Sequence, residues 1–253
     1  MKEHDESTDG PPLLRMLAAS PAIRLPGLTV FLISQEKARA VSDRLHDLLD
    51  PDETARSTEF ATWDLRHRYV TGRAALRSIL STIENGAVPA ADWRFGFSTN
   101  GKPYVRAPAN MGWFFNISYA EDLIAIAVSK EVEVGVDVEL SHVIPRDELP
   151  WHLFSGNEQQ VLKATPAANF MPVFLRFWTL KEAIAKRTGQ GVATEFSEID
   201  TTVMRVVDGL QAISHNAEPG VLLFHMARPI GDKTLFLSVS TSPIGRSQDV
   251  TTG

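Results

Sequence analysis

Stretches with strand character and stretches with helical spacing follow one another along this chain without strict alternation. Residues 28–34 (LTVFLIS) are apolar and β-branched, as in a buried strand. The spacing of apolar residues predicts a helix from Gln35 to Leu49, which Asp50-Pro51 ends. It predicts a longer helix from Leu65 to Ile83, which Asn85-Gly86 stops, with apolar residues inward and a series of arginines elsewhere.

The remaining elements continue this irregular order. Strand-like runs cover residues 93–99, 113–118, 123–128 and 132–140, and later residues 221–227 and 234–240. Helices are expected near residues 157–162 and 173–188. Strands and helices interspersed without βαβ repetition favour an α+β fold over a doubly wound parallel sheet.

The length and composition of the chain suit a packed globular protein. The 253 residues allow one large core or two smaller ones. A hydrophobic fraction of 43% and a charged fraction of 22% are ordinary for such a protein. Polar residues and prolines dominate the first dozen positions, so we expect a disordered extension over residues 1–22 and a disordered tail over residues 243–253.

Charge and cysteine content exclude several classes of function. The absence of cysteine excludes disulfides, thiolate metal sites and a cysteine nucleophile, and it fits a reducing, cytoplasmic location. A formal net charge of −6 argues against nonspecific nucleic-acid binding. The apolar stretch at residues 13–22 follows acidic residues and contains an arginine, so we predict neither a signal peptide nor a membrane span.

An acidic pair lies in the strand-like run Gly135-Val136-Asp137-Val138-Glu139. Alternate side chains of a strand share a face, so Asp137 and Glu139 point the same way. Two carboxylates on one face suit a hard divalent cation such as Mg²⁺. A strand whose solvent face happens to be acidic remains the alternative.

A second charged segment lies inside the later predicted helix. At about 100° per residue, Trp178, Lys181, Glu182 and Lys186 fall within one arc of roughly 140°. Lysines bind phosphate, and the carboxylate could complete a metal site or accept a proton. The alternative is an exposed Glu182–Lys186 pair at i,i+4 spacing.

Weaker signals accompany these two segments. Asn116-Ile117-Ser118 ends an aromatic strand, and Gly101-Lys102-Pro103 reads as a turn. Arginines 56, 66, 68, 73 and 77 could form an anion-binding face, although solvation is the default interpretation. The sequence contains no P-loop, GxGxxG, HExxH or GxSxG motif.

Taken in order, these segments resemble the Sfp-type 4′-phosphopantetheinyl transferases. Members carry a GKP turn, an N-x-S-H-S segment, a G-[IV]-D-[IV]-E strand and a W-x-x-K-E-x-x-x-K helix. The chain shows Gly101-Lys102-Pro103, Asn116-Ile117-Ser118, Gly135 to Glu139 and Trp178 to Lys186 in the same order. Arg56, Phe60, Arg68 and Gly72 also match the stretch before the GKP turn, and the resemblance covers roughly residues 28–240.

The resemblance implies a pseudo-dimer of two similar α+β halves, residues 23–131 and 132–242, with the active site in the cleft between them. Its substrates would be coenzyme A and an apo carrier protein. Asp137, Glu139 and Glu182 would hold Mg²⁺. Coenzyme A would contact Arg56, Arg68, Lys102, Ser118, Tyr119, Asp137, Lys181 and Lys186. An internally duplicated fold has less need to dimerise, so we expect a monomer.

The implied reaction is attack by a carrier-protein serine on the β-phosphate of coenzyme A, which releases adenosine 3′,5′-bisphosphate. Glu182 is the first candidate for the general base, and Lys186 would neutralise developing charge. Two alternatives remain: an inactive module that binds coenzyme A or a carrier protein, and an unrelated Mg²⁺-dependent nucleotide enzyme. The chain departs from the family at Tyr119-Ala120, where histidine and serine are usual.

Overall fold

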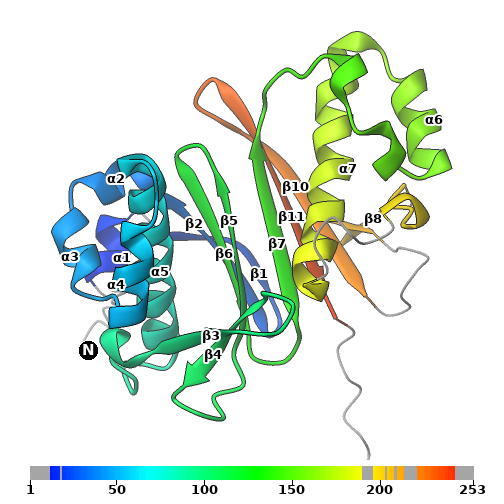
Figure 1. Ribbon diagram of the computed structural model, residues 1–253. Helices are drawn as coiled ribbons and strands as arrows, with labels where there is room; N and C mark the ends of the chain where they lie inside the picture. The colour runs from blue at the N-terminus through cyan, green and yellow to red at the C-terminus, as the bar shows by residue number, and fades with distance from the viewer. Residues whose placement is uncertain are drawn as a thin grey trace, which may run out of the picture.

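Two antiparallel sheets form the centre of the molecule, and each is covered by one long helix (Figure 1). This computed structural model describes residues 12–17, 19–189, 196–202, 204–207, 210–213 and 221–242. The predicted tail at residues 243–253 lies outside these ranges, as do residues 1–11 of the predicted extension. The observed mixture of helices and strands agrees with the predicted α+β class.

The first sheet has the strand order β1-β2-β6-β5. Its strands are β1 (Ser20–Leu25), β2 (Leu28–Ser34), β6 (Leu123–Ser129) and β5 (Phe114–Ala120). A separate hairpin joins β3 (Arg94–Phe97) to β4 (Pro103–Ala107). The helices on this side are α1 (Pro12–Met16), α2 (Gln35–Arg39), α3 (Ser42–His46), α4 (Pro51–Thr58) and α5 (Trp63–Ile83). A short 3-10 helix, η1 (Ala90–Asp92), precedes β3.

The second sheet has the strand order β7-β11-β10-β9-β8. Its strands are β7 (Val134–Leu140), β11 (Lys233–Thr241), β10 (Leu222–Ile230), β9 (Leu210–Ile213) and β8 (Met204–Val207). Two α-helices accompany it, α6 (Gly156–Ala164) and α7 (Ala167–Thr188). The described residues of this part also include the 3-10 helices η2 (Arg146–Glu148), η3 (Trp151–Leu153) and η5 (Phe196–Glu198).

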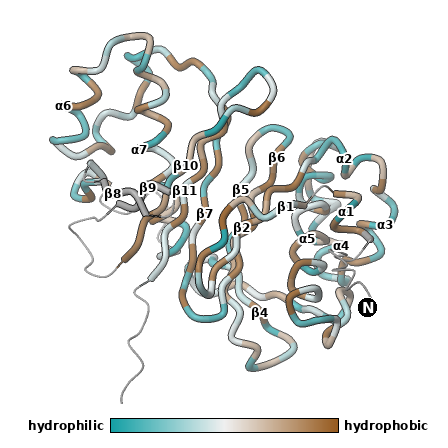
Figure 2. The backbone as a smooth tube through the Cα atoms, turned by 180° about the vertical axis from the view of Figure 1, so that it is seen from behind, coloured by the Kyte–Doolittle hydropathy of each residue, from teal (hydrophilic) through white to brown (hydrophobic). Residues whose placement is uncertain are grey.

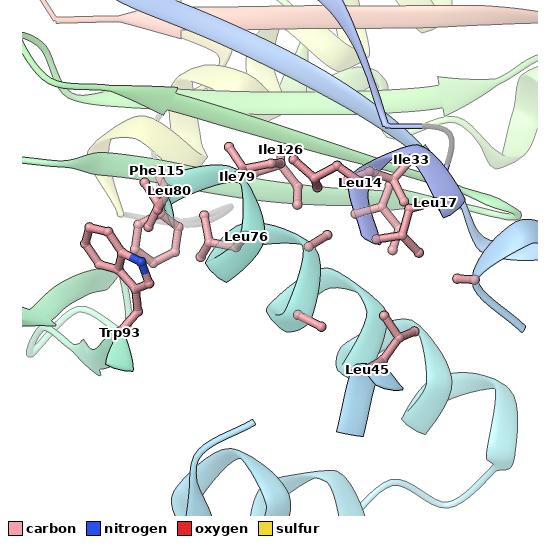
Figure 3. Packing of buried hydrophobic residues seen from close by; sticks show 14 of the residues in the cluster. Leu14, Leu17, Ile33, Leu45, Leu76, Ile79, Leu80, Trp93, Phe115 and Ile126 are labelled. Carbon is pink, nitrogen blue, oxygen red and sulfur yellow. The ribbon is translucent and has the colours of Figure 1, made fainter. Parts of the chain in front are cut away.

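The core is divided into layers by the alternation of side chains along the strands. In Figure 3, Leu76, Ile79 and Leu80 of α5 reach toward Phe115 and Ile126 on one face of the first sheet. The other face of that sheet packs against the second sheet through residues such as Val30 and Val136. The hydropathy of the elements follows this layering: in Figure 2, the buried strand β6 is largely hydrophobic and the outer helix α2 is largely hydrophilic.

Two predictions for residues 35–51 differ from the structure. The expected helix over residues 35–49 is broken into α2 and α3 at Val41, where the chain bends and keeps Ala38, Val41 and Leu45 buried in the α5 cluster. Asp50-Pro51 begins α4 instead of only ending a helix, because Asp50 and Glu53 form a capping box with Pro51 in the first turn.

The predicted extension also differs from the structure, because residues 12–17 and 19–22 are ordered. Residues 12–16 form α1 and residues 20–25 form β1. Leu14 and Leu17 are buried in the α5 cluster, and burial of such apolar side chains offsets the entropy of ordering the segment.

Two arginines of α5 are buried, although solvent exposure was the default interpretation for all of them. Arg77 is fully buried and pairs with Asp50 Oδ2 at 2.9 Å and Glu53 Oε2 at 2.6 Å. Arg73 is buried beside it, with Nε 2.6 Å from Glu53 Oε1. These two arginines therefore tie α5 to α4, because buried charges are stable only when paired. Among the described residues, no helix is long and apolar enough to cross a membrane.

Candidate active site

Strand β7 places the two predicted carboxylates where the sheets meet. Val136 and Val138 belong to the cluster packed between the two sheets, whereas Asp137 and Glu139 line a pocket together with Glu182 of α7. This split follows from the two-residue period of a strand. The predicted common direction of Asp137 and Glu139 is therefore confirmed.

Gly135 allows α7 to lie unusually close to β7. A Cβ atom at this position would lie 3.0 Å from Arg187 Cα and closer than that to Ala183 O and Arg187 N. These are backbone atoms of α7, which cannot move aside as a side-chain tip can. The glycine is therefore required by the packing of the strand against the helix, and this packing sets how far Lys186 and Glu182 stand from Asp137.

The pocket at the junction of β5 and β7 has a volume of about 500 Å³ and draws on both predicted halves. Arg68, Ile117, Ser118 and Tyr119 line it from the first half, and Asp137, Glu139, Trp178, Glu182 and Lys186 line it from the second. Three carboxylates thus share one pocket with one ammonium and one guanidinium group. Such a mixture suits a ligand that carries both an anionic group and a bound cation.

Lys186, Asp137 and Ser118 form the centre of this pocket. Lys186 Nζ lies 2.6 Å from Asp137 Oδ1 and donates a hydrogen bond to Ser118 Oγ at 2.9 Å. The Ser118 hydroxyl donates to the same Asp137 Oδ1 at 2.8 Å. Only 6% of the Asp137 side chain is exposed, against 29% for Lys186, so the ammonium reaches the carboxylate from the open side of the pocket.

Polar side chains of β5 join the two sheets beneath the pocket. Asn116 Oδ1 accepts a hydrogen bond from Val136 N at 3.0 Å, and Ser118 Oγ accepts one from Val138 N at 3.3 Å. Both donors belong to β7, whose only strand partner in the described part of the chain is β11. The Asn-x-Ser segment therefore satisfies buried backbone groups of the acidic strand, in addition to presenting Ser118 to the pocket.

Burial opposes ionisation of all three carboxylates. Removal from water raises the pKa of Asp137, while the Lys186 ammonium and the Ser118 hydroxyl act in the opposite direction. Burial also raises the pKa values of Glu139 and Glu182, and the negative charge of Asp137 raises them further. These groups would be stabilised in their charged forms by a cation placed among them.

The donor set fits a hard cation that keeps part of its water shell. Asp137 Oδ2 is buried and has no hydrogen-bond partner, so one carboxylate oxygen is available as a ligand. Among the described residues, no three histidine, aspartate or glutamate side chains stand close enough together to form a complete ligand set. Mg²⁺ is commonly held by one or two carboxylates together with substrate phosphates and water, and it does not need a closed protein cage.

Lys181 does not reach the pocket, contrary to its predicted contact with coenzyme A. Its side chain is fully buried, and Nζ lies 2.9 Å from Glu158 Oε2 of α6. The same ammonium donates to Phe196 O at 2.5 Å and Ile199 O at 2.7 Å. The helical arc places Lys181 near Glu182, but α6 packs on that side of α7 and captures the lysine.

Two other predicted ligands of coenzyme A lie outside the lining of the pocket. Arg56 is exposed, forms an ion pair with Glu59 and lies over the Phe60 ring, 5.7 Å from its centroid. Lys102 is half-buried, donates to Arg187 O at 2.5 Å and lies 3.3 Å from Glu133 Oε2. The structure therefore ties Lys102 to the end of α7.

Tyr119 and Arg68 form the wall of the pocket on the side of the first sheet. The Arg68 guanidinium lies 5.3 Å from the centroid of the Tyr119 ring. Burial raises the pKa of Tyr119 to about 12, so its hydroxyl is neutral at physiological pH. The hydroxyl points at Gly72 of α5, where a Cβ atom would lie 3.1 Å from both Tyr119 Cζ and Cε1 and closer still to Oη.

Comparisons with known proteins match the part of the chain that supplies five of the nine residues lining this pocket. Residues 133–222 match the family model described as the 4′-phosphopantetheinyl transferase superfamily. This stretch of the chain is similar to that superfamily. The match begins just before β7 and takes in both acidic segments.

Curated relatives of the chain include several 4′-phosphopantetheinyl transferases. HetI of Nostoc sp. is 34% identical over 158 residues, which are 59% of this chain and 65% of HetI. AcpT of Escherichia coli strain K12 is 36% identical over 140 residues, 54% of this chain and 65% of AcpT. Psf-1 of Bacillus pumilus is 29% identical over 162 residues, 64% of this chain and 66% of Psf-1. The chain thus spans slightly less than two thirds of these relatives and matches the family that its motifs resemble.

Sequence reasoning missed the residues that support the pocket from behind. Glu158, the partner of Lys181, is fully buried. The Ser155-Gly-Asn-Glu158 pattern is a capping-box signal that indicates the start of a helix and says nothing about burial. The packing role of Gly135 was missed as well, and the only available signal was a glycine inside a strand-like run.

Proposed function

We propose that this protein transfers the 4′-phosphopantetheine group of coenzyme A to a serine hydroxyl of an apo carrier protein and releases adenosine 3′,5′-bisphosphate. The observation that carries the proposal is the pocket in which Asp137, Glu139 and Glu182 meet Lys186 and Arg68. A diphosphate with a bound divalent cation matches this charge distribution. The superfamily match covers the strand and the helix that supply four of these five side chains.

Arg68 and Lys186 are the proposed contacts for the phosphates of coenzyme A. Both line the pocket from opposite sides, so a phosphate-rich ligand between them would receive charge-assisted hydrogen bonds. Ser118 would add a neutral hydrogen bond, and Tyr119 would contact the ligand through its ring. Because Lys181, Lys102 and Arg56 have other partners, we omit them from the proposed donor site.

Asp137, Glu139 and Glu182 would hold Mg²⁺, which when bound would neutralise part of the diphosphate charge. The buried, unpartnered Oδ2 of Asp137 supports this assignment. The three carboxylates would bind the cation, and their negative charge would keep a second anion away from that side of the pocket.

In the proposed reaction the carrier serine oxygen forms a new bond to the β-phosphorus, and the bond from that phosphorus to the bridging oxygen breaks. The electron pair leaves with adenosine 3′,5′-bisphosphate, and Lys186 stabilises the charge that develops. The serine proton passes to Glu182. Burial and the charge of Asp137 raise the pKa of Glu182 in the ligand-free protein, and a cation bound among the carboxylates would oppose that rise.

The arrangement of the molecule supports two further parts of the proposal. Each half contributes one antiparallel sheet covered by one long helix, α5 or α7, as expected for a pseudo-dimer of similar α+β halves (Figure 1). The pocket already combines side chains from both halves within one chain, so a monomer would suffice. Light scattering during size exclusion tests the monomeric state.

Intact mass measurement tests the proposed activity. Purified protein is incubated with coenzyme A, Mg²⁺ and an apo carrier protein, and the expected result is a mass gain of one phosphopantetheine. A carrier protein whose acceptor serine is replaced by alanine serves as the control and should gain nothing. Binding of coenzyme A without a mass gain on any carrier protein would contradict the proposal and favour an inactive binding module.

A further inference from the structure

The ammonium group of Lys186 already occupies a cation position at the carboxylate that is expected to bind the divalent ion. Its Nζ lies 2.6 Å from Asp137 Oδ1 and 2.9 Å from Ser118 Oγ, so the lysine is held by two partners. The side chain approaches from the open side of the pocket, where 29% of it remains exposed. It can therefore leave without rearrangement of the core.

We infer that Lys186 is a built-in counter-cation for Asp137, which a divalent cation must displace and which a diphosphate group then receives. This inference rests on the proposed function for the identity of the diphosphate ligand. In the ligand-free protein, Lys186 pairs with the buried carboxylate of Asp137, because an unpaired buried charge is strongly unfavourable. With both ligands bound, the same ammonium pairs with phosphate.

Two observations support this exchange over a fixed ion pair. Asp137 Oδ2 is buried without a partner, so the carboxylate has unused capacity beyond the lysine. Glu139 and Glu182 line the same pocket, so the site carries more negative than positive charge while Lys186 is present.

The exchange predicts that the divalent cation and the diphosphate bind cooperatively. The cation alone must displace Lys186 and leave it without an anionic partner at Asp137. A diphosphate offers the displaced ammonium a new partner, so each ligand raises the affinity for the other by the same factor. Lys186 is then a positioning residue for the cation as well as a contact for the donor.

The first test measures binding of Mg²⁺ by calorimetry at pH 8, without a carrier protein. Lys186→Met removes the competing ammonium with little change in volume, and Mg²⁺ should bind at least about tenfold more tightly than to the wild type in the absence of coenzyme A. Arg68→Met is the matched control, since it removes one positive charge from the same pocket without touching Asp137. It should change the affinity less than about threefold.

The second measurement concerns cooperativity in the same samples. Saturating coenzyme A should raise the Mg²⁺ affinity of the wild type more than that of Lys186→Met, because the variant has no ammonium to relocate. Equal affinity in the wild type and Lys186→Met, an equal gain in Lys186→Met and Arg68→Met, or no Mg²⁺ binding by any variant would overturn the inference.

Chemical labelling of the wild type keeps the inference testable if the variant does not fold. Amine acylation followed by mass spectrometry should show Lys186 protected in the free protein, exposed by Mg²⁺ alone, and protected again by Mg²⁺ with coenzyme A. The exposed Lys37 serves as the internal reference and should label equally throughout. If Mg²⁺ does not change the extent of Lys186 labelling, the exchange is wrong. Transfer to a carrier protein by the same preparation would still support the proposed function.

Discussion

Replacement of Gly135 by alanine should disturb both folding and the pocket, because a single methyl group would separate β7 from α7. The new Cβ would stand 3.0 Å from Arg187 Cα and closer still to Ala183 O and Arg187 N. Since ordinary carbon contacts lie near 3.5–4.0 Å, the helix must retreat by roughly 1 Å. Overpacking of this kind typically costs about 1–3 kcal/mol, and the backbone partners favour the upper end of that range.

The same retreat would move Lys186 and Glu182 away from Asp137, since both side chains lie on α7 close to the contact. A misplacement of about 1 Å at a catalytic group can lower a rate by about 10²-fold. Urea unfolding followed by fluorescence measures the loss of stability, and the carrier-modification assay measures the loss of rate at a temperature where the variant stays folded.

Gly156→Ala is the matched control for this prediction. This glycine begins α6, and a Cβ atom there would meet nothing within 4 Å. The substitution should leave stability unchanged or raise it by up to about 1 kcal/mol, because alanine restricts the unfolded chain. If Gly135→Ala changes the free energy of unfolding by no more than this control does, the close approach of β7 and α7 does not require a glycine.

Three further predictions concern charged and polar side chains. Lys181→Met should lower the free energy of unfolding in urea by about 3–5 kcal/mol, because it breaks a buried ion pair. Arg56→Ala breaks an exposed pair and should lower it by less than about 1 kcal/mol. Similar losses in the two variants would contradict the burial of Lys181. Asp137→Ala or Glu182→Ala should abolish transfer in the intact-mass assay, and near-normal turnover in either would refute the metal assignment. Tyr119→Phe should cost little activity because the phenol is neutral, with a pKa of about 12. Tyr119→His should bind coenzyme A more tightly at pH 6 than at pH 8, since imidazole gains a proton as the pH falls. Equal calorimetric affinities at the two pH values would show that position 119 does not face a phosphate.

Local periodicity predicted the parts of the site that depend on neighbours in the sequence. Asp137 and Glu139 share a face because strand side chains alternate, whatever packs against them. Glu182 and Lys186 share a helix face for the analogous reason, one turn apart. The strand and helix assignments around these residues were likewise confirmed, although β7 begins two residues later and α7 six residues earlier than predicted.

The positions of Lys181, Arg73 and Arg77 depended on segments remote in the sequence. A helical wheel places Lys181 beside Glu182. In the structure, α6 supplies a carboxylate to Lys181, and Phe196 of η5 and the following Ile199 supply two carbonyl oxygens. Arg73 and Arg77 read as solvated charges until α4 brings its acidic residues against α5. The pattern along one element states only which side chains lie together on it.

Gly135 shows the same limit in its simplest form. The sequence alone determined that a glycine precedes an acidic pair in a strand, and it gave no reason for the missing side chain. Only the packing of α7 against β7 revealed that the space for a Cβ is filled by helix backbone. Periodicity is a property of one backbone segment. Burial, ion pairing and close approach depend on two segments that pack together, and the tertiary fold determines which segments those are.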